Sequence, residues 1–145
     1  MKDPSHLIRK KVYDALNGNI TLDGSALPVY NVVPDNGSIP YIYIYSVSNE
    51  NTEDNKSNYI SNITTRIEVV TAFPTNTGGQ LDCNLAMNQI TQLLVSKSSF
   101  FDLSSDNFNV YNAINGGITY ITNDNNTDTV YRAVLEFESN VEQTA

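Results

Sequence analysis

Two stretches of the chain alternate strictly between two kinds of side chain. In residues 40–48 one side carries three tyrosines and Val47, and the other carries isoleucines followed by serines. In residues 63–73 the odd positions hold isoleucine, valine, threonine and phenylalanine, while the even positions include Arg66 and Glu68. Successive side chains of a β-strand leave opposite faces, so a period of two predicts strands. The sequence therefore predicts two long strands, joined by the acidic, Asn-rich loop 49–58.

A different period marks two helices. Ile8, Val12, Ala15 and Leu16 recur at the spacing of one helical face, and Asn17-Gly18 ends this first helix in the usual way. Asp3 is expected to cap its free N–H groups, and Pro4 to occupy its first position.

The second helix is predicted from about Gly79 to Ser96. Its apolar stripe comprises Cys83, Met87 and Ile90, widened by neighbouring alanine and leucine residues. A stripe of this kind at helical spacing indicates a core-facing helix. Cys83 is expected to pack there as a small apolar side chain.

The remaining segments are shorter. Residues 19–27 are expected to form a loop, 29–33 a short strand, and 108–121 a strand bent or bulged at Gly116-Gly117. A polar turn at 123–128 leads into a last strand over 129–139, with Tyr131, Leu135 and Phe137 toward the core. The tail, 140–145, is expected to fray.

This order of elements predicts an α+β fold in one domain spanning residues 1–145. We expect a mostly antiparallel sheet of about four to five strands, with two helices packed on one face. The face that carries Tyr41, Tyr43 and Tyr45 has two possible roles, either as part of the buried core or as a contact with another subunit.

Charge narrows the classes of function. The 145 residues include 16 acidic and 8 basic side chains, a net charge of −8. Duplex binding depends on Lys and Arg neutralising phosphates, so a nucleic-acid-binding module is not expected. No apolar run approaches the roughly 20 residues that span a bilayer. The charged N-terminal segment lacks a signal-peptide pattern, so we expect an intracellular origin and no membrane contact. The single cysteine excludes an internal disulfide.

Four features of the sequence are candidate sites of chemistry. The only histidine, His6, lies in the first turn of a predicted helix and is expected to be solvated. Asp124-x-Asn126-x-Asp128 opens like a calcium loop, but the glycine and glutamate that such a loop needs are replaced by Thr129 and Leu135, which favours a plain turn.

Gly78-Gly79 before a helix could cradle an anion, although a hinge is favoured because no Lys-Ser/Thr follows. Glu136 and Glu138 share one strand face, but a catalytic pair also needs a cleft and a shifted pKa. No catalytic, cofactor-binding or metal-binding residue is predicted, no cofactor is expected, and the chain is not expected to be an enzyme.

The sequence resembles the tail terminator, or tail completion, proteins of tailed bacteriophages. The resemblance runs nearly end to end, through the segments Lys11-Val12-Tyr13-Asp14-Ala15-Leu16, Val29-Tyr30-Asn31-Val32-Val33-Pro34, Ile39-Pro40-Tyr41-Ile42-Tyr43-Ile44, Thr64 to Phe73, the second helix, and Tyr131-Arg132-Ala133-Val134-Leu135-Glu136-Phe137. The order of elements carries it more than any single motif. The loop 49–58 and the stretch 98–115 are longer than the family pattern.

The resemblance implies a virion structural protein, assembled in the host cytoplasm and located in the tail or neck. Such proteins form a ring, commonly a hexamer, that ends polymerisation of the tail tube and joins it to the head connector. DNA passes through without specific binding. The tips at 49–58 and 123–128 are candidate docking segments. Alternatives left open are a neck connector or stopper protein, a small acidic ligand- or metal-binding enzyme domain, and a monomeric surface-binding module.

Overall fold

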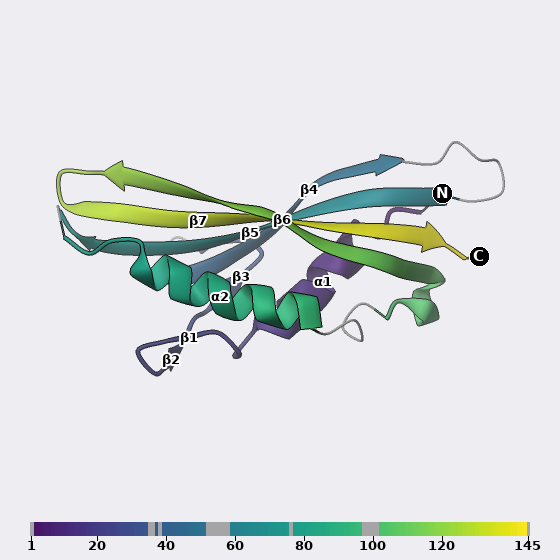
Figure 1. Ribbon diagram of the computed structural model, residues 1–145, viewed down its shortest axis with the longest axis horizontal. Helices are drawn as coiled ribbons and strands as arrows, with labels where there is room; N and C mark the ends of the chain where they lie inside the picture. Colours follow the sequence, from purple (N-terminus) through teal and green to yellow (C-terminus); the bar gives the residue numbers. More distant parts are fainter. Residues whose placement is uncertain are drawn as a thin grey trace.

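A long, twisted sheet dominates the structure (Figure 1). The computed structural model describes residues 2–34, 37, 39–51, 59–75, 77–96 and 102–144, with the backbone alone for 95, 96, 111 and 112. The elements follow the order α1 (Ser5–Leu16), β1 (Thr21–Leu22), β2 (Ser25–Ala26), β3 (Val29–Tyr30), β4 (Tyr41–Asn51), β5 (Tyr59–Pro74), α2 (Leu81–Ser96), the 3₁₀ turn η2 (Ser104–Asp106), β6 (Phe108–Asp124) and β7 (Asp128–Gln143). The prediction of an α+β fold with a mostly antiparallel sheet is confirmed.

Five strands form the large sheet in the order β3-β4-β5-β7-β6, and β1 and β2 form a separate hairpin. All pairings are antiparallel except that of β3 with β4. β5 is paired with β7 along its whole length, from Tyr59 opposite Gln143 to Pro74 opposite Asp128. The strands cross at a marked twist, the expected right-handed coiling of long strands (Figure 1).

Alternation along β5 determines which residues enter the core. Ile63, Ile67 and Val69 are fully buried, together with Ile42 and Ile44 on β4. The same cluster includes Leu135 and Phe137 of β7 and the apolar stripes of both helices. α1 contacts β4, β5 and α2, whereas α2 contacts β5, β7 and β6. The prediction that Tyr131, Leu135 and Phe137 face the core is confirmed, with Tyr131 partly buried.

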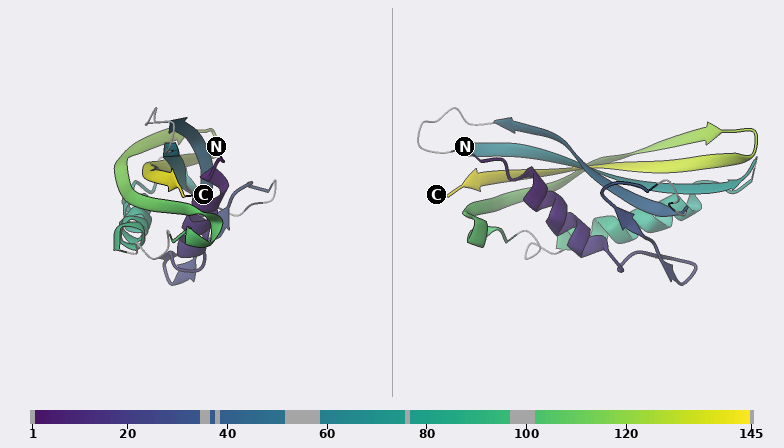
Figure 2. Two further views of the ribbon diagram at one scale, coloured as in Figure 1. Left: turned by 90° about the vertical axis from the view of Figure 1, so that its right-hand side faces the viewer. Right: turned by 180° about the vertical axis from the view of Figure 1, so that it is seen from behind.

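Helix α1 begins at Ser5, and Pro4 is its N-cap residue instead of its first helical residue. Asp3 accepts hydrogen bonds from the Ser5 backbone N (2.9 Å) and the Ser5 hydroxyl (2.6 Å). Asp3 therefore satisfies a free N–H group of the first turn as expected, but from the position before the N-cap residue, which is Pro4. The chain ends meet near this point, because the Lys2 backbone N donates to Gln143 Oε1 at 2.9 Å (Figure 2).

Three predicted boundaries are wrong. Residues 19–27 contain the β1–β2 hairpin, whose turn has Asp23 and Gly24 at positive φ. The strand predicted over 29–33 stops at Tyr30. Residues 140–143 belong to β7 instead of a frayed tail, because Val141 is buried and pairs with Ser61 and Val110 on either side.

β6 confirms the predicted bend at Gly116-Gly117. The register with β7 shifts between Asn115 and Ile118, where one extra residue makes a β-bulge. Gly117 has φ +123°, and a Cβ on Gly116 would come within 3.0 Å of the Glu136 carbonyl oxygen. Glycine at both positions therefore permits the bulge.

Two buried threonines on the core side of β5 differ in their hydrogen bonding. The Thr71 hydroxyl donates to the Tyr131 carbonyl at 3.2 Å, whereas the Thr65 hydroxyl has no partner among the described residues. Replacing Thr65 with valine should raise the free energy of unfolding by about 1 kcal/mol, because an unsatisfied buried hydroxyl is removed. The matched Thr71→Val change should lower it by about 1 kcal/mol. Urea denaturation measures both, and a loss of stability on Thr65→Val would contradict the assignment.

The cap at Asp3 predicts a pH dependence of stability. The bonds from Ser5 lower the pKa of Asp3 below its ordinary 3.8. The stabilisation is then complete above that ordinary value and is lost as the pH falls through the lower folded pKa. Asp3→Ala should lower the free energy of unfolding by about 0.5–1 kcal/mol at neutral pH. It should leave that free energy almost unchanged at pH values low enough to protonate Asp3 in both the folded and the unfolded state. Asp14→Ala, which removes only an exposed pair with Lys10, is the control. A cost that is the same at all pH values would contradict the prediction.

Candidate functional site: the polar face, the β6 edge and the hairpin cleft

One face of the large sheet is only half-buried and carries an ordered polar network, here called the polar face. It consists of Tyr43, Tyr45, Arg66, Glu68, Arg132 and Glu136. The Arg66 Nε donates to Glu136 Oε1 at 2.7 Å, and the Arg66 guanidinium carbon lies 5.7 Å from the centre of the Tyr45 ring. The Tyr43 and Tyr45 ring centres are 4.7 Å apart. The tyrosine side chains therefore do not form the core, which is built from the isoleucines that alternate with them.

The protonation states on the polar face follow from these contacts. Hydrogen bonds from Arg66 to the Tyr45 hydroxyl and to Glu136 raise the pKa of Arg66. Burial raises the pKa of Tyr45. Both groups therefore keep their protons over the physiological range. Because the Arg66 and Glu136 side chains are each about one-third exposed, at 34% and 36%, the pair orders the face more than it stabilises the fold.

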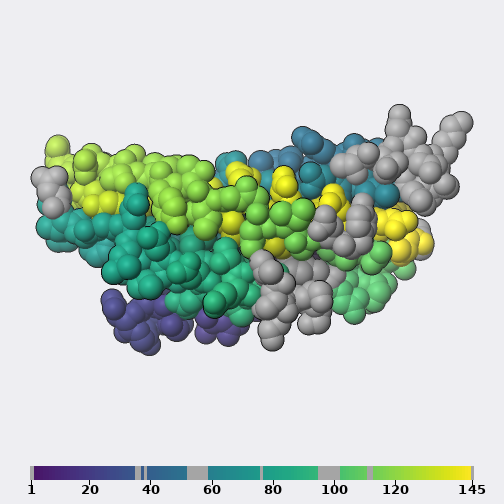
Figure 3. Space-filling model, in the orientation of Figure 1, coloured from purple at the N-terminus to yellow at the C-terminus, as the bar shows by residue number. Residues whose placement is uncertain are grey.

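β6 is the edge strand on one side of the sheet, and no described element pairs with its outer edge. Ile114, Ile118, Tyr120 and Ile121 are all exposed on it. The segment from Ile118 to Asn123 contains no charge, proline or glycine. In the space-filling view, the lime-green atoms of the later part of β6 lie along the upper left of the molecule (Figure 3). Such an edge is a template for pairing with another strand, and charges or prolines are the usual devices that prevent this.

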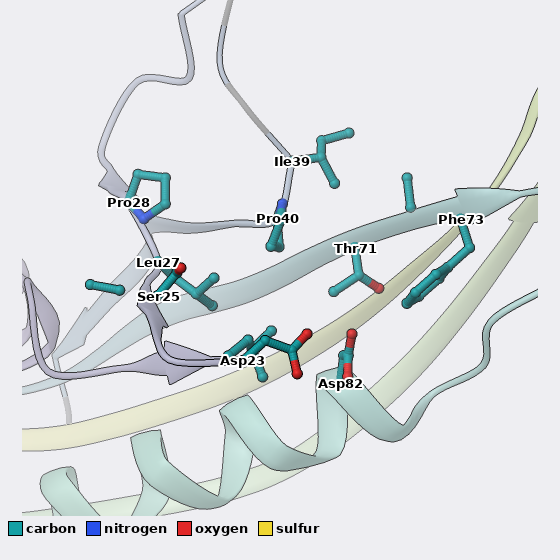
Figure 4. A pocket seen from close by; sticks show the side chains of 12 residues that line it. Asp23, Ser25, Leu27, Pro28, Ile39, Pro40, Thr71, Phe73 and Asp82 are labelled. Carbon is teal, nitrogen blue, oxygen red and sulfur yellow. The ribbon is translucent and has the colours of Figure 1, made fainter.

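A cleft of about 470 Å³ lies beside the β1–β2 hairpin and is here called the hairpin cleft. Its walls come from the hairpin, from Leu27 and Pro28, from Ile39 and the cis-linked Pro40, and from the end of β5. The carboxylates of Asp23 and Asp82 lie near each other at one side, and the Phe73 ring closes another (Figure 4). The cleft is therefore an apolar depression with an acidic margin, on the side of the sheet where β3 and β4 begin.

The sequence candidates do not converge on this cleft. His6 is exposed on α1, as expected. The segment 124–128 is a turn closed by its own side chains, because Thr129 donates to Asp124 Oδ1 at 2.8 Å and Asn125 donates to Asp128 Oδ1 at 3.0 Å. The loop 49–58 lies mostly outside the described residues, although 49–51 extend β4.

The other candidates are also dispersed. Glu136 is paired with Arg66, whereas Glu138 lies further along β7 and forms no salt bridge with the described residues. Cys83 is fully buried, and burial raises the pKa of its thiol, so it packs as a core residue. Among the described residues, no group of three or more His, Cys, Asp or Glu side chains could hold a metal ion. Neither described helix combines the length and apolar character needed to cross a bilayer.

Sequence reasoning missed the hairpin cleft. Its walls come from segments far apart in the chain, and the β1–β2 hairpin was expected to be a plain loop. The signal available was the Asp23-Gly24 pair, a common hairpin turn. No protein-family model matches the chain, and no curated protein matches it either.

Gly78 and Gly24 give a matched test of the packing around the cleft. Both have φ near +80°, but only at Gly78 would a Cβ overlap the Phe73 side chain. Gly24→Ala should cost about 1 kcal/mol from the backbone conformation alone. Gly78→Ala should cost about 2–4 kcal/mol, because it also displaces a ring that lines the cleft. Thermal unfolding of the two variants measures this, and equal losses would show that Phe73 moves freely.

Proposed function

We propose that this chain is a virion structural protein that forms a ring at the head-proximal end of a phage tail tube, ends tube polymerisation and joins tail to head. In this proposal both helices cover one face of the sheet, and the polar face and the sheet edges are left for neighbouring molecules. The ring is a homo-oligomer, most often a hexamer in the family that the sequence resembles.

The observation that carries the proposal is the outer edge of β6, with which no described element pairs. A stable monomer is expected to protect a long strand edge with charges, prolines or a covering loop. Here Ile118, Tyr120 and Ile121 are exposed in a segment without such devices. An edge of this kind suits a subunit whose edge is covered in an assembly. A head-to-tail contact between such subunits closes into a ring when the rotation between copies is suitable.

Charge and shape add support. Net charge of −8 disfavours retention of DNA on a channel wall. The β6–β7 turn projects at one end of the long sheet (Figure 2), as a segment that docks on a tube or connector would. The arrangement also suits a neck connector or stopper, which would use the same kind of ring.

The hairpin cleft favours a second candidate of a different class, a small acidic ligand-binding domain. Its apolar walls and the carboxylates of Asp23 and Asp82 would suit a small ligand with a positive charge. A ligand-binding domain of this kind would function as a monomer, whereas a tail-end ring would function only as an oligomer.

The test of the proposed function uses the full chain with purified tail tubes of the phage that encodes it. We expect a ring-sized mass by light scattering, alone or on tubes, and a single cap at one end of each tube by negative-stain microscopy. Capped tubes should not elongate when free tube subunits are added. A protein that stays monomeric and leaves tube ends bare and growing would overturn the proposal, and caps only on preformed connectors would favour the stopper.

A further inference from the structure

The two edges of the large sheet differ in their apolar side chains and their charges. At one edge, β6 exposes Ile118, Tyr120 and Ile121. At the other edge, β3 is only two residues long, and Ile39 and Val32 near it are exposed. These are two apolar surfaces on opposite sides of one sheet.

The strand register places the two surfaces at the same level of the sheet. Tyr120 of β6 lies in one row with Ala133, Val69, Ile42 and finally Val29 of β3. The next row on the opposite face joins Ile121, Arg132, Val70 and Tyr41, two residues after Ile39. A copy set beside the molecule in the same orientation would therefore bring β6 of one against the β3–β4 edge of the other. The two strands would run antiparallel, because β6 is antiparallel to β4 across the sheet.

Charge distinguishes pairing of β6 with the β3–β4 edge from the alternative, which is pairing of β6 with β6 of a second copy. Helix α1 carries three cations and one carboxylate, a net charge of +2, and it packs beside β4, where Arg9 donates to the Ser46 hydroxyl at 2.9 Å. Residues 108–143, which form β6, β7 and their turn, carry five carboxylates and one cation, a net charge of −4. Pairing β6 with β6 would set two such segments against each other. Pairing β6 with the β3–β4 edge instead brings this acidic segment to the side of the sheet that carries the cations of α1, and the carboxylates of Asp23 and Asp82 at the cleft oppose part of that attraction.

We propose that the partner of the β6 edge is the β3–β4 edge of a second copy of this chain, with the apolar side chains of β6 seated against Ile39 and the mouth of the hairpin cleft. The proposal rests on the ring function proposed above and specifies its interface. The contact is heterologous, so each copy uses both edges, which is what a closed ring requires. The cleft walls Leu27, Pro28 and Ile39 supply the apolar seat.

Thiol cross-linking distinguishes the two pairings. Ile121→Cys and Ile39→Cys are made singly and together, and each protein is treated with a short bismaleimide, alone and with tail tubes. The buried Cys83 of the parent protein serves as the background control. We expect a ladder of covalent oligomers from the double variant, covalent dimers and nothing larger from a mixture of the two single variants, and no cross-linked product from either single variant alone.

A second pair of variants tests the energetics. Ile121→Lys should weaken assembly on the order of tenfold or more, about 1.4 kcal/mol per factor of ten, because it places an unpaired charge in the contact. Leu85→Lys is the matched control, since Leu85 on α2 is 45% exposed and Ile121 is 41% exposed. Leu85→Lys should leave the oligomer mass unchanged. Circular dichroism checks that both variants remain folded.

The outcomes separate this inference from the proposed function. Covalent dimers from Ile121→Cys alone would overturn it in favour of β6–β6 pairing. A ring-sized particle that the double variant does not cross-link, or that Ile121→Lys leaves intact, would overturn the interface but leave the ring function standing. A chain that remains monomeric with and without tubes would overturn both.

Discussion

The structure depends on the central strand β5 being two-faced along its length. It is hydrogen-bonded to β4 on one side and to β7 on the other, so its backbone groups are satisfied within the sheet. Its odd-numbered residues from Ile63 to Thr71 are buried, and most of its even-numbered residues are half-exposed. Shifting this strand by one residue would exchange the two faces. The alternation therefore fixes which side of every neighbouring strand is buried.

The two faces then serve different purposes. The buried isoleucine, valine and phenylalanine residues of the sheet belong to one core cluster with apolar residues of α1 and α2. The polar face gathers tyrosines and paired charges, whose contacts order the side chains without removing them from water. Arg66 illustrates the difference, because it pairs with Glu136 and lies over Tyr45 while a third of its side chain remains exposed. Such a face can remain in contact with water, and it is also rich in groups that form contacts with other proteins.

At the edges of the sheet, backbone N–H and C=O groups have no neighbouring strand to pair with. β6 is held on one side by β7 and has an outer edge that no described element pairs. The bulge at Gly116-Gly117 interrupts the edge near its middle, and the segment that follows presents Ile118 and Tyr120 on one face and Ile121 on the other. The asymmetry of charge between α1 and the β6–β7 hairpin gives the molecule two unlike sides. A subunit with two unlike and complementary sides is suited to head-to-tail association, whereas a subunit with one self-complementary patch is suited to a dimer.

The sequence by itself determined the two helices, the long strands and the class of fold. Periods of two and of 3.6 depend on local geometry, so Ile63 to Phe73 and Ile8 to Leu16 reveal their burial without knowledge of their partners. The bend at Gly116-Gly117 was also visible, because glycine pairs mark such sites. The place of Val141 in β7 was not visible in the sequence. A polar tail joins a strand only when residues on both sides, here Ser61 and Val110, are present to pair with it.

Tertiary structure alone decided where the candidate surfaces lie. The hairpin cleft joins Asp23, Pro40, Phe73 and Asp82, which are far apart in the chain and share no motif. Whether a strand such as β6 is central or at an edge depends on the order of strands in the sheet, and that order is a long-range property. Local patterns report how one residue relates to its neighbours along the chain, whereas edges, clefts and opposite sides arise only when distant segments are packed together.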